Sequence, residues 1–222
     1  MSIEGMNLDS AVVFMDEAIK QFHESVSSDS LSVLDFGCGQ GALISGLAER
    51  GYTSFGCDIE EYWTDVNAIN TVFRKIEWDP YKLPFDDNTM DVVVSTSVLE
   101  HAQNTERAFE EMNRVLKPGG CSIHFYPGKW YLPSEPHIFV PLVNFFWPNC
   151  PRWWLALWAR LGVRNDFQRD LDWREVTDLN EKYCKTGLNY ISSSEYRRIS
   201  MRTFGNCEFP DEFLICRSLD LI

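Results

Sequence analysis

The sequence predicts an α/β protein with a doubly wound, mostly parallel sheet and a helical, aromatic-rich insertion after its fifth strand. One observation behind this prediction is that short apolar runs of strand length alternate with segments of helical periodicity. The other is that the first apolar run, 31–36, opens directly into a loop containing Gly37, Gly39 and Gly41. Such a loop allows a sharp strand-to-helix turn and lets a ligand approach the main chain.

Five apolar runs have the length of strands, and they cover residues 31–36, 52–57, 72–78, 91–95 and 121–126. Five further segments carry apolar side chains at helical spacing, and they cover residues 10–26, 42–50, 105–116, 172–184 and 193–201. Helix ends are marked by Gly51 and by Pro118 with its two following glycines. With 222 residues and 45% hydrophobic side chains, the chain can bury one sizeable core, so a single domain over 1–222 is expected.

Polar side chains stand at or just beyond the ends of four predicted strands: Asp35, Asp58, Asp79 and Ser95. In doubly wound sheets, ligands bind outside the carboxyl ends of the strands, at the topological switch point. A single acidic residue after a strand is usually a helix cap or a turn former. Because four such residues stand at successive strand ends, they favour a ligand site instead.

Charge and cysteine content exclude some classes of protein. The net charge of −13 argues against a sequence-independent nucleic-acid binder, which needs a basic face, and no nucleic-acid partner is expected. The seven cysteines are scattered without a CxxC pair, so no metal site is expected and a reduced, cytoplasmic setting fits best. Residues 1–10 lack the basic and apolar regions of a signal peptide.

Six motifs follow one another along the chain, at residues 34–41, 57–59, 79–85, 90–95, 98–101 and 114–120. In content, order and spacing, these motifs resemble those of class I S-adenosylmethionine-dependent methyltransferases of the type 11 branch. A glycine-rich loop alone is shared by many nucleotide-binding folds, but this ordered set is highly specific. The resemblance implies a Rossmann-like class I methyltransferase fold, S-adenosylmethionine as the cofactor, and methyl transfer to a small-molecule, saccharide or lipid-linked acceptor, with O-methylation favoured.

The resemblance also implies the cofactor-binding residues, which are Asp35, Phe36, Gly37, Cys38, Gly39, Gly41, Asp58, Ile59, Asp79, Pro80, Ser95 and Thr96. Asp35 would lie close to the ammonium group, and Asp58 would accept both ribose hydroxyls as a bidentate carboxylate. Asp79 would accept the adenine amino proton, with Ile59 and Pro80 packed against the ring. The glycine loop, together with Ser95 and Thr96, would border the methionine end of the cofactor.

The C-terminal end departs from the family pattern. After Gly205 only 17 residues remain, which leaves room for a sixth strand over 207–217 but hardly for the usual closing antiparallel hairpin. Either a shortened sheet or an unusual fold of the tail is therefore expected.

Two alternative functions compete with this interpretation. A nicotinamide dehydrogenase is the first, because residues 37–42 fit a relaxed GxGxxG/A pattern and Asp58 could hold a ribose. Its pyrophosphate would, however, meet Asp35, and it predicts none of the later motifs. The second is a catalytically silent cofactor-binding scaffold that uses the insertion to bind a partner or a membrane; the intact set of cofactor residues disfavours it.

The segment 127–190 is too long for a simple connection, and we expect a lid or a substrate-selecting insertion. It holds six of the eight tryptophans of the chain, at Trp130, Trp147, Trp153, Trp154, Trp158 and Trp173. Prolines and arginines interrupt its most apolar part, 138–162, so two short helices are expected rather than a membrane span. Three interpretations of 138–162 stay open: a lid packed on the core, an interfacial helix or lipid groove in peripheral contact with a membrane, and a surface for a protein partner.

Methyl transfer to a hydroxyl is helped by a general base, and histidines are the candidates. His137, in the insertion, is the first choice, and His101, at the end of the Leu-Glu-His motif, is the second. His124 alternates with apolar residues in a strand, which favours a structural role. Tyr126 and Trp130, together with His137, are expected to line the acceptor pocket.

Overall fold

The computed structural model describes residues 8–23, 27–63, 71–78, 81–126, 137–208 and 213–218. The chain divides into two compact units. The first unit comprises Met1–Leu99, Asn104–Tyr126 and Arg197–Ile222, and the second comprises Glu100–Gln103 and Pro127–Tyr196. Each unit is described by itself.

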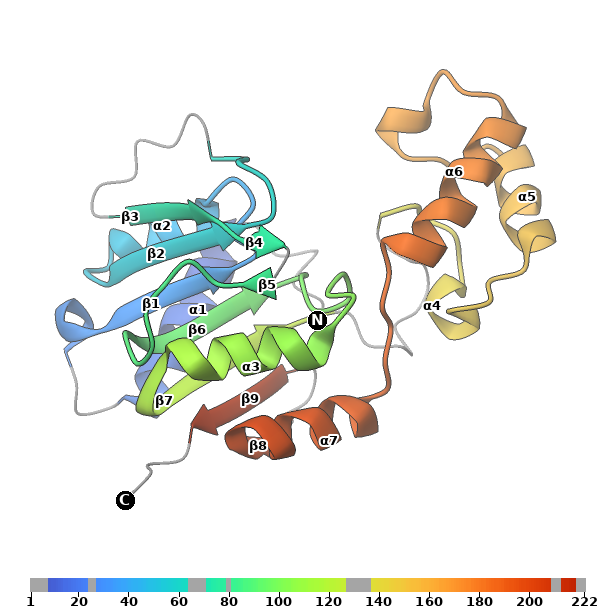
Figure 1. Ribbon diagram of the computed structural model, residues 1–222. Coiled ribbons are helices and arrows are strands. Elements are labelled where there is room, and N and C mark those ends of the chain that lie inside the picture. Colours follow the sequence, from blue (N-terminus) through green and yellow to red (C-terminus); the bar gives the residue numbers. More distant parts are fainter. Residues whose placement is uncertain are drawn as a thin grey trace. The chain divides into compact units, whose positions relative to one another are not determined.

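The strands of the first unit that form its main sheet are β1 Ser32–Phe36, β2 Thr53–Asp58, β3 Thr71–Lys75, β6 Met90–Thr96, β7 Leu116–Phe125, β8 Gly205–Glu208 and β9 Phe213–Ser218. Their order is β3-β2-β1-β6-β7-β9-β8 (Figure 1). The five strands from β3 to β7 in this order pair in parallel, whereas β9 is antiparallel to both β7 and β8. The doubly wound, mostly parallel sheet predicted from the sequence is confirmed.

Helices cover both faces of this sheet. They are α1 Leu8–Phe22, α2 Ala42–Ala48, α3 Thr105–Val115 and α7 Ser193–Phe204. On β7, Ile123 belongs to the core cluster that α1 and α2 build, while the ring of the next residue, His124, stacks on Phe109 of α3. Because successive side chains of a strand point to opposite faces, α3 lies on the face opposite α1 and α2. Phe109 also meets Phe204, the last residue of α7, edge to face.

The third predicted strand, 72–78, is wrong in its extent. β3 ends at Lys75, and Glu77–Trp78 is a separate short strand, β4, which pairs antiparallel with β5 Tyr81–Lys82. The reason is the length of the neighbour: Lys75 is paired with Asp58, the last residue of β2, so the sheet offers no partner beyond that point. Apolar patterning in one strand does not show where its neighbour stops.

The predicted sixth strand over 207–217 is also wrong, because this segment holds two strands. α7 ends at Phe204 and β8 begins at the next residue, Gly205, whose φ of +78° turns the chain. No linker is needed, and β8 with β9 completes an antiparallel pair beside β7. The C-terminal segment therefore forms an antiparallel pair at the edge of the sheet, although only 17 residues follow Gly205.

The second unit is helical. Its elements are α4 Val143–Phe146, α5 Arg152–Arg160, the 3-10 helix η3 Asp166–Gln168 and α6 Trp173–Thr186. The two short helices expected in 138–162 are thus present. They pack with α6 around a core that includes Ile138, Val140, Val143, Leu155, Cys184, Leu188 and Tyr190. In the part of the chain that the structure describes, no helix has the length and apolarity to cross a membrane.

Arg114, near the end of α3, holds the segment after β5 against the first unit. Its guanidinium donates to the carbonyls of Phe85 and Leu83, both at 2.9 Å, and to the Glu111 carboxylate at 2.7 Å. Glu111 is buried and also accepts from the Leu83 amide at 2.9 Å. Burial alone would raise the pKa of Glu111, but the hydrogen bonds from Arg114 and Leu83 outweigh it, and the pKa lies below its ordinary value.

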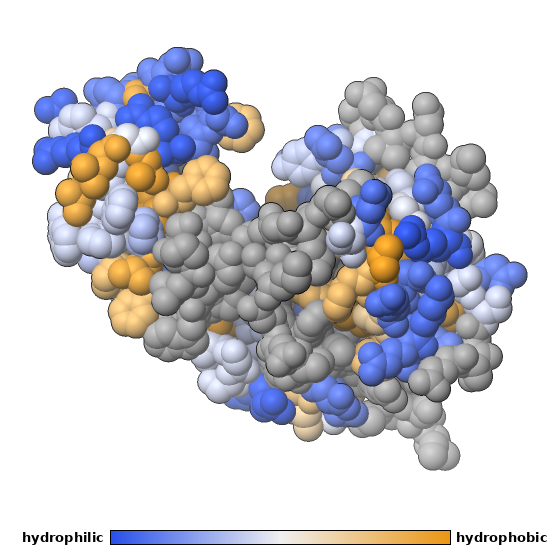
Figure 2. All heavy atoms as spheres, turned by 180° about the vertical axis from the view of Figure 1, so that it is seen from behind, coloured by the Kyte–Doolittle hydropathy of each residue, from blue (hydrophilic) through white to orange (hydrophobic). Residues whose placement is uncertain are grey.

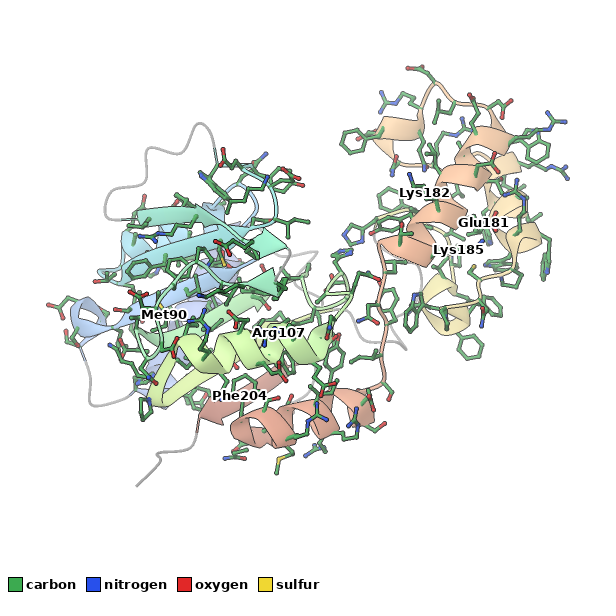
Figure 3. All side chains as sticks on the ribbon, viewed as in Figure 1. Met90, Arg107, Glu181, Lys182, Lys185 and Phe204 are labelled. Carbon is green, nitrogen blue, oxygen red and sulfur yellow. The ribbon has the colours of Figure 1, made fainter. Side chains whose placement is uncertain are left out.

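Replacing Arg114 with Met should lower the free energy of unfolding by about 3 kcal/mol, because the buried Glu111 carboxylate loses its main partner. The matched control is Arg107→Met on the same helix (Figure 3), whose pairs with Glu110 and Glu111 are more exposed, and it should change stability by less than about 1 kcal/mol. Urea unfolding of the three proteins measures both. The difference between wild type and Arg114→Met should shrink as the pH falls through the lowered pKa of Glu111, since protonation removes the pair. Equal losses in the two variants would contradict this account.

Candidate functional site

The glycine loop after β1 is tied to the end of β2. The amides of Gly37 and Cys38 both donate to the Cys57 carbonyl, at 2.8 and 3.0 Å. The φ angles of Gly37 and Gly41 are +77° and +80°, a region that side chains disfavour. A Cβ at Gly37 would lie 2.4 Å from the Val98 side chain, so space as well as conformation requires glycine there.

An aromatic ring closes the other side of the loop. A Cβ at Gly41 would lie 2.5 Å from the Phe73 ring, and Phe73 stands opposite Gly56 in the pairing of β2 with β3. Trp63 stacks on the same ring, with centroids 5.5 Å apart. Sequence reasoning missed these two rings, since the only signal was that Gly41 and Gly56 lack side chains and so leave room for an aromatic neighbour.

Asp58, at the end of β2, is held by two main-chain amides. The Gly39 amide donates to Oδ2 at 2.8 Å and the Ile59 amide to Oδ1 at 2.7 Å. Each carboxylate oxygen keeps further acceptor capacity, so two hydroxyl groups of a ligand can be bound in addition. The Ile59 side chain is 45% exposed and offers apolar surface next to this carboxylate. The position where Gly39 would carry a Cβ faces open space.

Asp35 is buried in the middle of the sheet, 2% exposed, on a strand that pairs with β2 on one side and β6 on the other. Its Oδ1 has no hydrogen-bond partner among the described residues. Burial raises the pKa of this carboxyl, and the negative charge of Asp58 raises it further, to about 7. A buried polar atom without a partner is unfavourable, and a cationic ligand group would satisfy it.

Ser95 and Thr96 form the end of β6, which extends one residue beyond the predicted end of this strand at Ser95. Ser95 is fully buried, and its hydroxyl lies 2.8 Å from Nδ1 of His124. Burial lowers the pKa of His124 to about 3, so this histidine is neutral and acts as a packing and hydrogen-bonding group. Thr96 is partly exposed and stands opposite Phe125 in the pairing with β7.

The remaining predicted residues of this site divide between described and undescribed parts. Phe36 and Cys38 are buried, and burial together with the charges of Asp35 and Asp58 raises the pKa of the Cys38 thiol, which stays protonated. Tyr126 is partly buried just after β7. The predicted residues Asp79, Pro80 and Trp130 lie outside the described residues.

The second unit brings together both histidines proposed as general bases. Nε2 of His101 lies 3.3 Å from Nε2 of His137, with the rings edge to face at 4.7 Å. The Tyr183 ring lies 6.3 and 5.9 Å from these two rings, and Oε1 of the buried Glu100 lies 3.8 Å from Nε2 of His101. Sequence reasoning identified the histidines but missed Tyr183, which carries no signal beyond an apolar helix position.

The hydrogen bonds fix the protons of this histidine pair. Nδ1 of His101 donates to the Gly187 carbonyl at 2.6 Å, because a carbonyl only accepts. The neutral His101 ring therefore presents a lone pair at Nε2, to which Nε2–H of His137 donates. A further proton on the pair would be stabilised by the Glu100 carboxylate, so the pair can accept one proton from an acidic group.

Comparisons with known proteins show similarity to methyltransferases over a segment that contains the glycine loop. Residues 34–123 match the model of a family described as a methyltransferase domain. The sterol 4-C-methyltransferase strm-1 of Caenorhabditis elegans is 29% identical over 118 residues, 48% of this chain and 35% of the relative. The demethylmenaquinone methyltransferase of Staphylococcus aureus is 29% identical over 182 residues, 78% of this chain and 71% of the relative. The chain spans about half the length, or less, of most curated relatives that it matches.

The fold is found in solved structures as well. A candidate sarcosine dimethylglycine methyltransferase from Galdieria sulphuraria aligns with a TM-score of 0.56 over 95% of this chain and 85% of its own, at 15% identity. At that identity the likeness shows the fold alone. Through residues 34–123, the chain is thus similar to the S-adenosylmethionine-dependent methyltransferases, a family whose methyl donor is S-adenosylmethionine.

Proposed function

We propose that the protein is an S-adenosylmethionine-dependent methyltransferase that methylates a small-molecule, saccharide or lipid-linked acceptor, with O-methylation favoured. The observation that carries the proposal is the pair of carboxylates at neighbouring strand ends. Asp35 offers a buried oxygen that suits an ammonium group, and Asp58 is oriented by two amides to accept a diol. Residues 31–49 contain no Lys or Arg, which fits a cofactor without phosphate and disfavours a dinucleotide.

The residues present fit this cofactor. The open space at Gly39 leaves room for a ligand against the main chain, and the exposed Ile59 side chain offers an apolar surface for a base. When bound, S-adenosylmethionine supplies a methyl group on a sulfonium, which is already a good leaving group. The protein then contributes chiefly by holding the donor and the acceptor in line and by excluding water.

The histidine pair supports methylation of a hydroxyl. In this proposal, the acceptor O–H loses its proton to the His101–His137 pair as the oxygen attacks the methyl carbon. Glu100 stabilises the positive charge that results. Two relatives are named for a sterol and for demethylmenaquinone, which supports an apolar small-molecule acceptor.

The wild-type protein should bind S-adenosylhomocysteine in a calorimetric titration, and Asp58→Asn should weaken binding about 10- to 100-fold, because hydrogen bonds to a charged acceptor are lost. The control is Asp29→Asn, an exposed carboxylate in a short 3-10 helix of the same unit, which should bind as wild type does. Absence of wild-type binding at millimolar ligand would refute the proposed cofactor site.

The affinity for S-adenosylhomocysteine should depend on the ionisation of Asp35. Its pKa of about 7 means that the ligand-free carboxyl is largely protonated below that pH, so affinity should rise about tenfold per pH unit up to about 7 and then level off. Asp35→Asn should bind weakly at every pH. A flat wild-type profile between pH 5 and pH 8 would contradict a direct role of this carboxylate.

Ionisation of Asp35, which should raise the affinity for S-adenosylhomocysteine, should lower the stability of the ligand-free protein. A carboxyl whose folded pKa is raised favours the folded state when protonated, so its contribution is full below about pH 4 and is lost as the pH rises to about 7. At pH 8, Asp35→Asn should therefore be more stable than wild type, by on the order of 1–3 kcal/mol in urea unfolding. A less stable variant would show that the carboxylate is satisfied within the fold.

Incubation with radiolabelled S-adenosylmethionine and a mixed metabolite and lipid extract should label an acceptor. With that extract, His137→Gln should reduce the rate by about 100-fold or more while S-adenosylhomocysteine affinity stays unchanged, because only proton removal is lost. Rates for the variant should recover at high pH, where the acceptor ionises without help. No labelling by wild type would favour the silent scaffold, and an unchanged variant would exclude His137 as the base.

A further inference from the structure

We propose that the second unit carries a membrane-binding surface, here called the aromatic face, which docks on a phospholipid bilayer. It consists of Phe145, Trp153, Leu157 and Leu161, which are 49%, 65%, 42% and 66% exposed. This inference does not rest on methyl transfer, since it concerns a surface of the second unit alone.

The outward side of α5 is apolar where a helix on a protein surface is normally polar. Leu155 and Ala159 are the inward positions, fully buried in the unit. Trp153, Leu157 and Leu161 follow at intervals of four residues, so they lie along one side of the helix and its end. The helix is therefore apolar on two sides, and only one of them is used by the core.

Aromatic contacts join α4 to this side of α5. The Phe145 ring meets Phe146 at 5.4 Å, Phe146 meets Trp154 at 6.1 Å, and Trp154 meets Trp153 at 5.6 Å, in each case edge to face. Trp154 is fixed by its Nε1–H, which donates to the Pro141 carbonyl at 2.7 Å. The exposed rings thus stand at the two ends of a continuous row, and Figure 2 shows apolar residues gathered on this unit.

The charges around the aromatic face match lipid headgroups. Residues 137–164 contain three arginines and no Asp or Glu, in a chain with 33 acidic and 20 basic side chains. Arg152 is paired with Asp178 and Glu181 of α6. Arg160 is not engaged by a carboxylate in any ion pair found among the described residues, and its guanidinium lies 4.0 Å from the Trp173 ring centre.

This composition favours one occupant. Tryptophan beside arginine, with apolar side chains between them, suits the interface between acyl chains and headgroups, where an aromatic ring can be buried while its polar edge stays wet. The 28 residues 137–164 add no carboxylate of their own, and Arg152 pairs with the nearby Asp178 and Glu181, which lowers the repulsion that anionic lipids would otherwise meet. A bilayer containing anionic phospholipid is therefore the expected partner.

Co-sedimentation of the full chain with vesicles, without cofactor, tests the proposal. Wild type should bind vesicles of equal parts phosphatidylcholine and phosphatidylglycerol, more weakly in high salt, and lipids spin-labelled in the acyl chain should quench its tryptophan fluorescence. The double variant Trp153→Ser, Leu161→Ser should bind about tenfold less or weaker still. Because both positions are exposed, it should unfold at the wild-type temperature. Met201→Ser, an exposed apolar residue of α7, is the matched control and should bind as wild type does.

Three results would overturn the proposal. One is wild type that stays in the supernatant with these vesicles. Another is equal vesicle binding by wild type and the double variant. The third is wild type that is dimeric by light scattering and does not bind vesicles, with the double variant monomeric, because the aromatic face would then be a contact between two copies of the chain. None of them bears on S-adenosylhomocysteine binding, so failure here is distinguishable from failure of the proposed function.

Discussion

The parallel pairing of β1 with β2 on one side and β6 on the other is the constraint on which the first unit depends. It brings three strand ends to one edge of the sheet, and it places Asp35 between two neighbours that bury it. The chain leaves β1 through a loop whose first amides are taken by the end of β2, so this loop and Asp58 are fixed to each other. The site is therefore a consequence of sheet register, and glycine is required where that register leaves no room.

Two buried carboxylates of the first unit, Glu111 and Asp35, differ in their hydrogen-bond partners and have pKa values shifted in opposite directions. Glu111 receives an arginine and a main-chain amide, and its pKa is lowered. Asp35 is more central, lacks a partner for one oxygen, and has its pKa raised. A buried carboxylate with hydrogen-bond partners stabilises the folded protein. A buried carboxylate with an oxygen that lacks a partner lowers the stability of the ligand-free protein. That contrast is the physical reason why we propose a ligand-binding role for Asp35 and not for Glu111.

The features predicted correctly from the sequence are those that depend on the residues of one short segment. The alternation of elements was predicted correctly, as were the positions of Asp35, Asp58 and Ser95 at or next to strand ends and the two short helices of 138–162. The end of β3 and the closing pair β8 and β9 were not, because each depends on the length or position of a partner strand. The contact of His101 with His137 joins residues 36 positions apart, and the packing of Phe73 on Gly41 and Gly56 requires the register of β2 with β3. Such contacts have no signal in one sequence.

The sequence of helix α5 in the second unit does not show which side of the helix is buried. The helix Arg-Trp-Trp-Leu-Ala-Leu-Trp-Ala-Arg is apolar all round, so its sequence cannot tell the core side from the outer side. In the structure, Leu155 is buried and Trp153 is exposed. The second unit has eight Lys or Arg against nine Asp or Glu, which leaves twelve of the thirteen net negative charges to the first unit. A near-neutral unit with an exposed apolar side meets less repulsion from an anionic bilayer than the acidic first unit does, and this difference in charge supports the proposed docking of the aromatic face.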